Sequence, residues 1–447
     1  MSIGQAYALS VFNLPLTRVV GIDHSAPEDW SLSATIWMFN VAFFCLGASA
    51  AVFGRWVERV GPRKTMAASA TCFAGGFFVA ALAVKLHLLF LLVLGYGVLG
   101  GIGLGLGYIA PVSTLIKWFP DRPGMATGMA IMGFGGGAMI ASPLGVTLMK
   151  RFGSPTSTGI AETFAVMGIV YFVFMAFGAA IVKLPRQSVA VVAEGEGATA
   201  DEAVRTKGFW LVWFVLFANV TAGIGILGQA SPMIQEMFEV TPAAAAGFVG
   251  LLSLFNLAGR FVWSSLSDRI GRKPTYAIYL GLGMALYAFV PVTKSLGPTL
   301  FVIATCIILS MYGGGFATVP AYLRDLFGTK QVGAIHGRLL TAWSLAALVG
   351  PTVLTQVREA RIARGIPKSD AYSATMFGLV ALLALGFVAN VLVKVESKKA
   401  APATITREAT NEATLPLARL AATWLVVLIP LAWGVSQVVT KALALFR

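Results

Sequence analysis

The stretch SSLSDRIGRK, residues 264–273, decides the fold because the chain contains a second copy of its charged end. The copy is ERVGPRK at 58–64, which has an acid, basic residues and a glycine in the same order. Asp268 and Glu58 are 210 positions apart. Such a fixed offset between distant segments is the mark of an internal repeat.

A second pair of segments repeats at nearly the same distance. YIAPVSTLIKWFPDRPGMATG (108–128) is similar to FATVPAYLRDLFGTKQVGAIHG (316–337), with matching residues 209 positions apart. The matches are Pro111 with Pro320, Gly124 with Gly333, and Gly128 with Gly337. The chain is therefore predicted to consist of two halves of one design, an organisation typical of secondary transporters with a substrate site between the repeats.

The composition is that of a membrane protein. Hydrophobic residues make up 57% of the 447 residues and charged residues only 12%, with a mean hydropathy of +0.81; soluble proteins have about 25% charged residues. Apolar runs such as MAASATCFAGGFFVAALAV from Met66 and MFGLVALLALGFVANVLV from Met376 are long enough to cross a bilayer core of about 30 Å. We expect an all-α polytopic protein surrounded by lipid.

The net charge of +14 could indicate nucleic acid as a partner, but the basic residues form short clusters between apolar spans. There they set the orientation in the membrane, so no nucleic-acid partner is expected. Cys45, Cys72 and Cys306 lie inside apolar spans without metal-ligand spacing. They are interpreted as packing residues, and neither a metal nor a cofactor is predicted.

Breaks between the apolar runs predict the domains. These are a six-helix half at 1–184, a cytoplasmic linker at 185–207, a second six-helix half at 208–395, a linker at 396–414, and an extra transmembrane or interfacial helix at 415–447. The opening segment MSIGQAYALSVFNLP reaches only about 22 Å as a helix, less than a bilayer core. We expect the first helix to be truncated at its N-terminal end.

Lysine and arginine predict the orientation. The cluster Arg59, Arg63 and Lys64 falls on the same side as Lys183, Arg186, Arg269, Arg272, Lys273 and Lys398. By the positive-inside rule this side is cytoplasmic. Both ends of the twelve-helix core are then predicted to be cytoplasmic, in a cell (inner) membrane. The basic loop at 356–371, on the opposite side, is an exception.

Arg260 is a charge in the middle of an apolar span, with no charged residue between Glu239 and it or between it and Asp268. An arginine at membrane depth costs a few kcal/mol or more, so it must face protein, water or an anion. The repeat aligns it with Ala50, so the charge belongs to one half and not to the shared scaffold. An internal salt bridge would need a carboxylate at the same depth.

The spans contain no such carboxylate. The candidates lie at span ends: Glu58, Asp268 and Asp325 at cytoplasmic ends, and Glu162, Glu236 and Glu239 at outer ends. A guanidinium offers a fork of donors that matches a carboxylate, so Arg260 is predicted to bind a substrate anion. Asn256 is one helical turn earlier on the same face and could orient the guanidinium or the ligand.

Several motifs resemble a known family. GRWVERVGPRK, SSLSDRIGRK and the glycine-rich GFGGGAMIASPLG (133–145) are similar to signatures of the major facilitator superfamily. WFPDRPGMATG and the Arg260 stretch resemble, more narrowly, the oxalate/formate antiporter family, which is related to the monocarboxylate transporters. The resemblance covers about residues 1–395. It implies the major facilitator fold, with two six-helix pseudo-repeats and one additional helix, and a transporter of small carboxylate anions, not an enzyme.

The resemblance also implies site residues. In the family the arginine binds the substrate carboxylate, and aromatic residues matching Tyr7, Tyr108, Tyr312 and Phe316 enclose the substrate. Oxalate-exchanging members have a second cation, a lysine, where this chain has Trp343, and no lysine occurs between Lys330 and Lys368. A single cation suits a monoanion. The expected substrates are formate, lactate, pyruvate or similar monocarboxylates, with oxalate/formate antiport proper as the alternative.

Without buried acids, exchange of one anion for another is expected, or entry of an anion together with a proton. His336 is the candidate proton carrier, although its other interpretation is a polar residue at a helix end.

The repeated motifs predict a conformational gate. Its residues are Gly54, Glu58, Arg59, Gly61 and Arg63 in the first copy, Asp268, Arg269, Gly271 and Arg272 in the second, and Asp325 and Arg338 as partners.

Within this gate Gly271 is expected to permit a tight turn and Asp268 to cap a helix N-terminus. The alternative is that the basic residues only set topology.

Other classes of function compete with a carboxylate transporter. A membrane enzyme would need a nucleophile with a base, or a metal cluster, and three scattered histidines supply neither. A non-transporting sensor or subunit on the same fold stays open, and a carboxylate-gated drug exporter is disfavoured.

Overall fold

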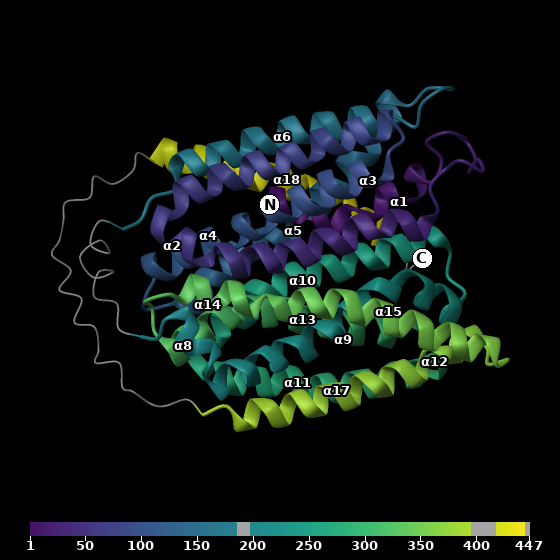
Figure 1. Ribbon diagram of the computed structural model, residues 1–447. Helices are drawn as coiled ribbons and strands as arrows, with labels where there is room; N and C mark the ends of the chain where they lie inside the picture. Colours follow the sequence, from purple (N-terminus) through teal and green to yellow (C-terminus); the bar gives the residue numbers. More distant parts are fainter. Residues whose placement is uncertain (186–196, 395–416, 443–447) are drawn as a thin grey trace.

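The computed structural model describes residues 1–185, 197–394 and 417–442 (Figure 1). Over these residues the chain is helical and contains no β-strand, which confirms the predicted all-α fold. The elements of the first half are η1 (Ser2–Ala8), α1 (Ser10–Leu16), α2 (Leu32–Lys85), α3 (Leu89–Leu92), the π-helical η2 (Val93–Gly100), α4 (Gly101–Trp118), α5 (Pro123–Phe152) and α6 (Ile160–Ile181).

A short helix, α8 (Ala200–Val204), precedes the second half. The elements of the second half are α9 (Lys207–Phe238), α10 (Pro242–Ile270), α11 (Arg272–Phe289), η3 (Val290–Val292), α12 (Thr293–Leu296), α13 (Pro298–Phe327), α14 (Val332–Leu339), α15 (Thr341–Ala363), α16 (Lys368–Ala371) and α17 (Ser373–Leu392). The last element is α18 (Leu417–Ala442). Ten helices of the described chain are long and apolar enough to cross a membrane.

The two copies of the charged motif form the same kind of turn. Gly61 has φ 79° and ψ 171°, and it breaks α2 into two crossings. Gly271 has φ 90° and ψ 157°, and it separates α10 from α11. A residue with a β-carbon is strained at such positive φ values, so glycine is required at both turns. We call the end of the bundle that contains these turns the motif end.

The two halves lie side by side along their length (Figure 1). They meet along two interfaces: α5 packs against α10, and α2 packs against α14 and α15. We call them the α5–α10 seam and the α2–α14 seam. In the first, Gly128 lies against the backbone carbonyl of Arg260, and in the second, Gly337 lies against that of Ala50. Residues that the repeat aligns therefore hold equivalent places in the two seams.

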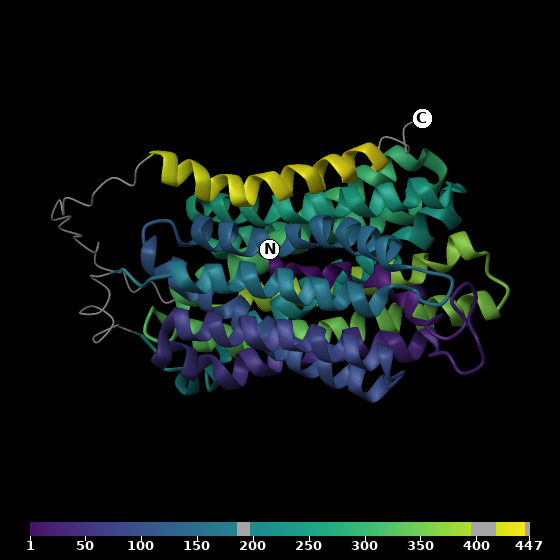
Figure 2. The same ribbon diagram turned by 90° about the horizontal axis from the view of Figure 1, so that it is seen from above.

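The extra helix α18 runs along the outside of the bundle (Figure 2). It packs against α10 and α5, where Gly434 lies against the backbone of Met139. Its 26 residues correspond to about 39 Å of helix, enough to span a bilayer. At the other end of the chain, Met1 lies inside the bundle, close to Gly133 of α5.

From Gly197 onward, the predicted linker at 185–207 packs against the second half. The amide of Ala198 donates to the carbonyl of Phe327 at 2.8 Å. The side chains of Thr199 and Glu202 form a capping box that starts α8. Residues 186–196 of this linker, and all of the predicted second linker at 396–414, lie outside the described residues.

Candidate functional site

Arg260 lies at the centre of the bundle, on α10, with 0% of its surface exposed. Its Nε donates to Asn256 Oδ1 at 3.1 Å, one helical turn earlier. Its Nη1 donates to the carbonyl oxygen of Ile131 on α5 at 3.3 Å, so the guanidinium crosses the α5–α10 seam. Nη2 has no hydrogen-bond partner among the described residues. The site therefore has one free charged donor.

Arg260 forms no ion pair with any described residue. Instead, the guanidinium carbon lies 5.4 Å from the ring centroid of Phe316 and 5.8 Å from that of Phe134. A cation over an aromatic face gains about 0.5–2 kcal/mol, less than the cost of burying an unpaired charge. The arrangement thus retains a strong affinity for an anion.

Aromatic side chains from both halves enclose this charge. Tyr7 packs edge-on against Phe134 at 5.1 Å between ring centroids, and Tyr108 does so at 5.6 Å. Trp343, on α15, lies 4.5 Å from Phe316 and 5.5 Å from Phe134 by the same measure. We call these rings the aromatic cage: Tyr7, Tyr108, Phe134, Tyr312, Phe316 and Trp343. Tyr312 belongs to it because its ring packs edge-on against Phe316 at 5.3 Å.

The cage contains several donors without partners. The hydroxyl groups of Tyr7, Tyr108 and Tyr312 and the indole nitrogen of Trp343 are buried, and none has a hydrogen-bond partner among the described residues. Buried polar groups are satisfied in the great majority of cases, so a cluster of exceptions beside a free cation needs an explanation. Together these groups match the needs of an oxygen-rich anion.

The sequence-predicted binding residues therefore come together: Arg260, Asn256, Tyr7, Tyr108, Tyr312, Phe316 and Trp343. Sequence reasoning missed Phe134, which packs against Tyr7, Tyr108 and Trp343. A signal was present, because Phe134 is the one large side chain within the run GFGGG at 133–137. Glycines on both sides let α5 approach α10 closely and leave the ring to fill the centre.

At the motif end each copy of the loop motif reaches into the other half. Asp268 accepts hydrogen bonds from the backbone N–H groups of Gly124 at 2.9 Å and Met125 at 2.8 Å, at the N-terminus of α5. Glu58 accepts one from the N–H of Gly333 at 3.2 Å, in the first turn of α14. Carboxylates are favourable at helix N-termini. Glu58 also pairs with Lys117 at 2.8 Å.

Two other sets of ion pairs involve predicted gate residues. Arg272 bonds to Asp268 and, at 3.3 Å, to Asp325, so that Asp325 pairs within its own half. Arg338 pairs at 2.6 Å with Asp201 of α8, which also bonds to Arg55. Asp325 therefore contacts the second copy of the motif, but within its own half, and Arg338 pairs with α8 instead of with a predicted gate residue.

The remaining basic residues of the motif lie on the surface. Arg63 donates to the carbonyl of Ala180 at 2.8 Å within the first half. Arg59 and Arg269 are exposed, and neither forms a hydrogen bond or an ion pair with a described residue. Gly54 lies where α2 approaches α14, and a β-carbon there would be 2.8 Å from the Cα of Ala334. Of the gate set, then, the residues that contact the opposite half are Glu58, Asp268, Gly54 and Arg272, whose guanidinium lies against Gly124.

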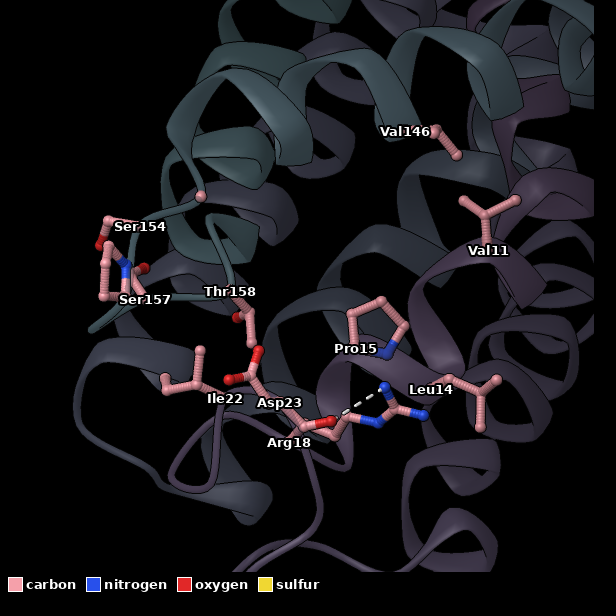
Figure 3. A pocket seen from close by; sticks show the side chains of 12 residues that line it. Val11, Leu14, Pro15, Arg18, Ile22, Asp23, Val146, Ser154, Ser157 and Thr158 are labelled. Carbon is pink, nitrogen blue, oxygen red and sulfur yellow. Dashed lines mark hydrogen bonds between the residues drawn. The ribbon is translucent and has the colours of Figure 1, made fainter.

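An open pocket at the surface of the described chain lies away from this centre. It measures about 960 Å³ and is lined by α1, the end of α5 and the loop at 153–158 (Figure 3). Arg18 there donates to the backbone carbonyl of Asp23 at 3.3 Å. None of its lining residues belongs to the predicted site. The central site itself is closed, since Arg260, Tyr108 and Tyr312 are at most 3% exposed.

Comparison with known proteins identifies the family to which this architecture belongs. The model of the Major Facilitator Superfamily matches residues 2–351. The chain belongs to the Major Facilitator Superfamily. The family and fold are those of membrane transporters, and they confirm the predicted resemblance. The structure of the superfamily transporter FucP in the outward conformation superposes with a TM-score of 0.64 at 14% identity, covering 88% of this chain and 97% of that one.

Among curated superfamily relatives, YhjX of Escherichia coli, an uncharacterised transporter, is 27% identical and covers 78% of this chain and 83% of its own. The oxalate:formate antiporter of Oxalobacter formigenes is 24% identical and covers 78% and 79%. The apicoplast pyruvate carrier 1 of Toxoplasma gondii is 25% identical and covers 81% and 75%.

Proposed function

We propose that this protein is a secondary active transporter that moves small organic monocarboxylates, of the formate, lactate and pyruvate class, by alternating access. The observation that carries the proposal is Arg260: a fully buried guanidinium with a free Nη2 and no ion pair among the described residues. In this environment the cargo supplies the missing negative charge.

The geometry of the cage supports a carboxylate as the bound group. Asn256 and the Ile131 carbonyl hold Nε and Nη1, and fix the plane of the guanidinium. A carboxylate oxygen accepts a hydrogen bond from Nη2, and the free hydroxyl groups of the cage donate hydrogen bonds to the remaining lone pairs of the carboxylate. The apolar ring faces exclude water, which strengthens the charge pairing.

One cation favours a monoanion. A second carboxylate would be desolvated beside Trp343 and Phe316 without a cation to pair with it, which costs several kcal/mol. Relatives named as an oxalate:formate antiporter and a pyruvate carrier support a small carboxylate substrate. The runner-up is oxalate/formate antiport proper, in which the cage must accommodate a dianion.

The motif end supplies the conformational gate. Asp268 at the N-terminus of α5 and Glu58 at that of α14 hold the two halves together there. Transport requires these contacts to break while the halves 1–184 and 208–395 rock about the central site. Two coupling modes fit the site: exchange of anions, or passage of an anion with a proton. We place the protein in the cell (inner) membrane, with the motif end on the cytoplasmic side.

The test is counterflow in proteoliposomes, with labelled formate, lactate, pyruvate and oxalate offered separately. We expect wild type to exchange monocarboxylates, and Arg260→Gln to lose about 3 kcal/mol of binding, equivalent to more than about 100-fold in affinity. Arg151→Gln is the matched control, because Arg151 is an exposed arginine at the far end of α5. It should exchange at the wild-type rate.

Each unexpected outcome of this experiment would favour a different alternative. Exchange of oxalate alone would replace the monocarboxylate assignment by oxalate/formate antiport. Normal exchange by Arg260→Gln would remove Arg260 from the site. Binding of anions without any counterflow would identify a sensor or subunit built on the transporter fold, since such a protein binds ligand without exchanging label.

A further inference from the structure

The segment η1, which carries Tyr7 of the aromatic cage, has an unusual helical form. It is a 3₁₀-helix over seven residues, Ser2–Ala8, whereas 3₁₀ segments longer than about three or four residues are uncommon because their hydrogen-bond geometry is poor. The segment η2, Val93–Gly100, is π-helical over eight residues. Helices of the π type are rare and occur frequently at functional sites. The contact between these two segments therefore needs an explanation.

A buried hydrogen bond joins η1 to η2. The hydroxyl of Tyr96 on η2 donates to Gln5 Oε1 on η1 at 2.7 Å, and both side chains are 0% exposed. Nε2 of Gln5 has no hydrogen-bond partner among the described residues. Hydrogen bonds are electrostatically stronger in a low-dielectric interior than in water. The bond to Tyr96 therefore fixes how η1 is turned about its own axis.

The other contact of η1 does not fix this rotation. The segment packs mainly against α5, where glycine meets glycine: a β-carbon on Gly137 would lie 2.6 Å from the Cα of Gly4. Glycines let two helices approach closely, but they offer no side chains that interlock. The Gly4–Gly137 contact thus sets the distance between η1 and α5, and the Gln5–Tyr96 bond sets the rotation of η1.

The rotation of η1 determines where Tyr7 points. With about 120° per residue in a 3₁₀-helix, Tyr7 leaves η1 about 240° round from Gln5, two residues earlier. This direction leads to the cage, where the Tyr7 ring lies 5.1 Å from that of Phe134 and 5.9 Å from that of Phe43. In an α-helix the same two residues would be about 200° apart. Loss of the 3₁₀ form would therefore turn the free Tyr7 hydroxyl by about 40°.

We infer that Tyr96 and Gln5 are positioning residues for Tyr7. Their hydrogen bond holds the Tyr7 hydroxyl where it donates to the substrate carboxylate, so the inference rests on the proposed function and deepens its site. Tyr96 itself is not part of the cage, since its ring packs against Phe77 inside the first half, at 5.3 Å between centroids. Loss of the bond should weaken substrate binding through Tyr7.

A neighbouring tyrosine provides a matched control. Tyr171 of α6 is also buried, and its ring lies 5.3 Å from that of the same Phe77. Its hydroxyl has no hydrogen-bond partner among the described residues. A tyrosine-to-phenylalanine change removes one hydroxyl at either position and keeps the ring. The two variants therefore differ in whether the bond to Gln5 is lost.

The experiment is a double-mutant cycle on the full-length protein in proteoliposomes. The KM and the maximal rate of counterflow are measured with whichever of labelled formate, lactate and pyruvate wild type exchanges fastest. We expect Tyr96→Phe to raise KM about five-fold, equivalent to the loss of one hydrogen bond of about 1 kcal/mol, and to keep the maximal rate within about two-fold. In the Tyr7→Phe background the same change should raise KM no further, because coupled residues are not additive. Tyr171→Phe should keep the wild-type KM.

Three results would overturn the inference: an unchanged KM in Tyr96→Phe, an equal rise with and without the Tyr7 hydroxyl, or an equal rise in Tyr171→Phe. Each would assign the bond to the packing of the first half and leave the proposed function intact. A wild type that exchanges none of the three anions would remove the proposed function, and the inference with it. If Tyr96→Phe does not elute as a folded monodisperse protein, Gln5→Met, which loses the same bond, takes its place in the cycle.

Discussion

The α5–α10 seam and the α2–α14 seam share a backbone plan but differ in charge. Both have a glycine against a backbone carbonyl of the facing helix, Gly128 at Arg260 and Gly337 at Ala50. Both end in a carboxylate at a helix N-terminus of the opposite half. Only the α5–α10 seam, however, has a cation at its centre. The repeat therefore supplies the moving scaffold, and the substitution of one residue in one copy supplies the chemistry.

The two carboxylate contacts also differ in detail. Asp268 accepts from two N–H groups, at 2.9 and 2.8 Å, whereas Glu58 accepts from one at 3.2 Å and shares its charge with Lys117. The longer side chain of glutamate gives a looser hold on the helix terminus. Of the two carboxylate contacts, we therefore expect the one at Glu58 to break more easily than the one at Asp268.

Among the variants that compare the two seams, the largest effect is expected from filling the close contacts. Gly128→Leu and Gly337→Leu each place a side chain against backbone of the facing helix, an overpacking that costs about 1–3 kcal/mol or more in a close-packed interior. Both variants should lose counterflow by about ten-fold or more, in proportion to that cost. Gly378→Leu is the control, since nothing lies within 4 Å of a β-carbon at that position.

A large loss in one glycine variant and none in the other would break the equivalence of the seams. Thermal unfolding of each variant in detergent separates failure to fold from failure to move. A variant that keeps its melting temperature but loses counterflow has lost the motion.

An intermediate effect is expected from the two carboxylates. Asp268→Asn removes a charge that accepts two backbone N–H groups and bonds to Arg272, for a loss of about 1–2 kcal/mol. Glu58→Gln should cost under about 1 kcal/mol of closure, because a single long contact with the other half is lost. The ion pair with Lys117, whose two side chains are 11% and 14% exposed, lies within the first half. Distances between spin labels on the two halves at the motif end report the closed fraction.

The ordering of these two variants is the test. If Glu58→Gln opens the motif end as far as Asp268→Asn does, the difference in hydrogen-bond number has no consequence and the seams are energetically alike. Glu58→Asp sharpens the comparison. If this shorter acid increases the closed fraction, side-chain length determines how strongly the carboxylate binds the helix N-terminus.

The smallest effect is expected at Arg59 and Arg269, the exposed basic residues of the two motif copies. Neither forms a hydrogen bond or an ion pair with a described residue, and isolated surface charges contribute about 0–1 kcal/mol. Initial rates of counterflow for Arg59→Gln and Arg269→Gln should stay within about two-fold of wild type. A loss as large as that of Asp268→Asn would give these arginines a partner in the open state.

Much of this organisation could be predicted from the sequence. The offsets of 209 and 210 identified the paired positions of the two seams, and the apolar surroundings of Arg260 indicated its depth. Periodicity says nothing, however, about which helix of the other half faces a given residue. For that reason the sequence named Asp325 and Arg338 as gate partners without assigning their contacts, and it missed the position of Phe134 in the cage. Asp201 was unassigned because its segment read as a flexible linker.

The contacts of Asp201 connect the resting state of the transporter to the ionic strength around it. This carboxylate bonds at once to Arg55 of the first half and Arg338 of the second, and its side chain is 54% exposed. Exposed ion pairs are screened by dissolved salt over a Debye length of about 8 Å at physiological concentration. A bridge that joins both halves in this way weakens as salt rises, so the balance between closed and open forms should shift with the electrolyte of the compartment that the motif end faces.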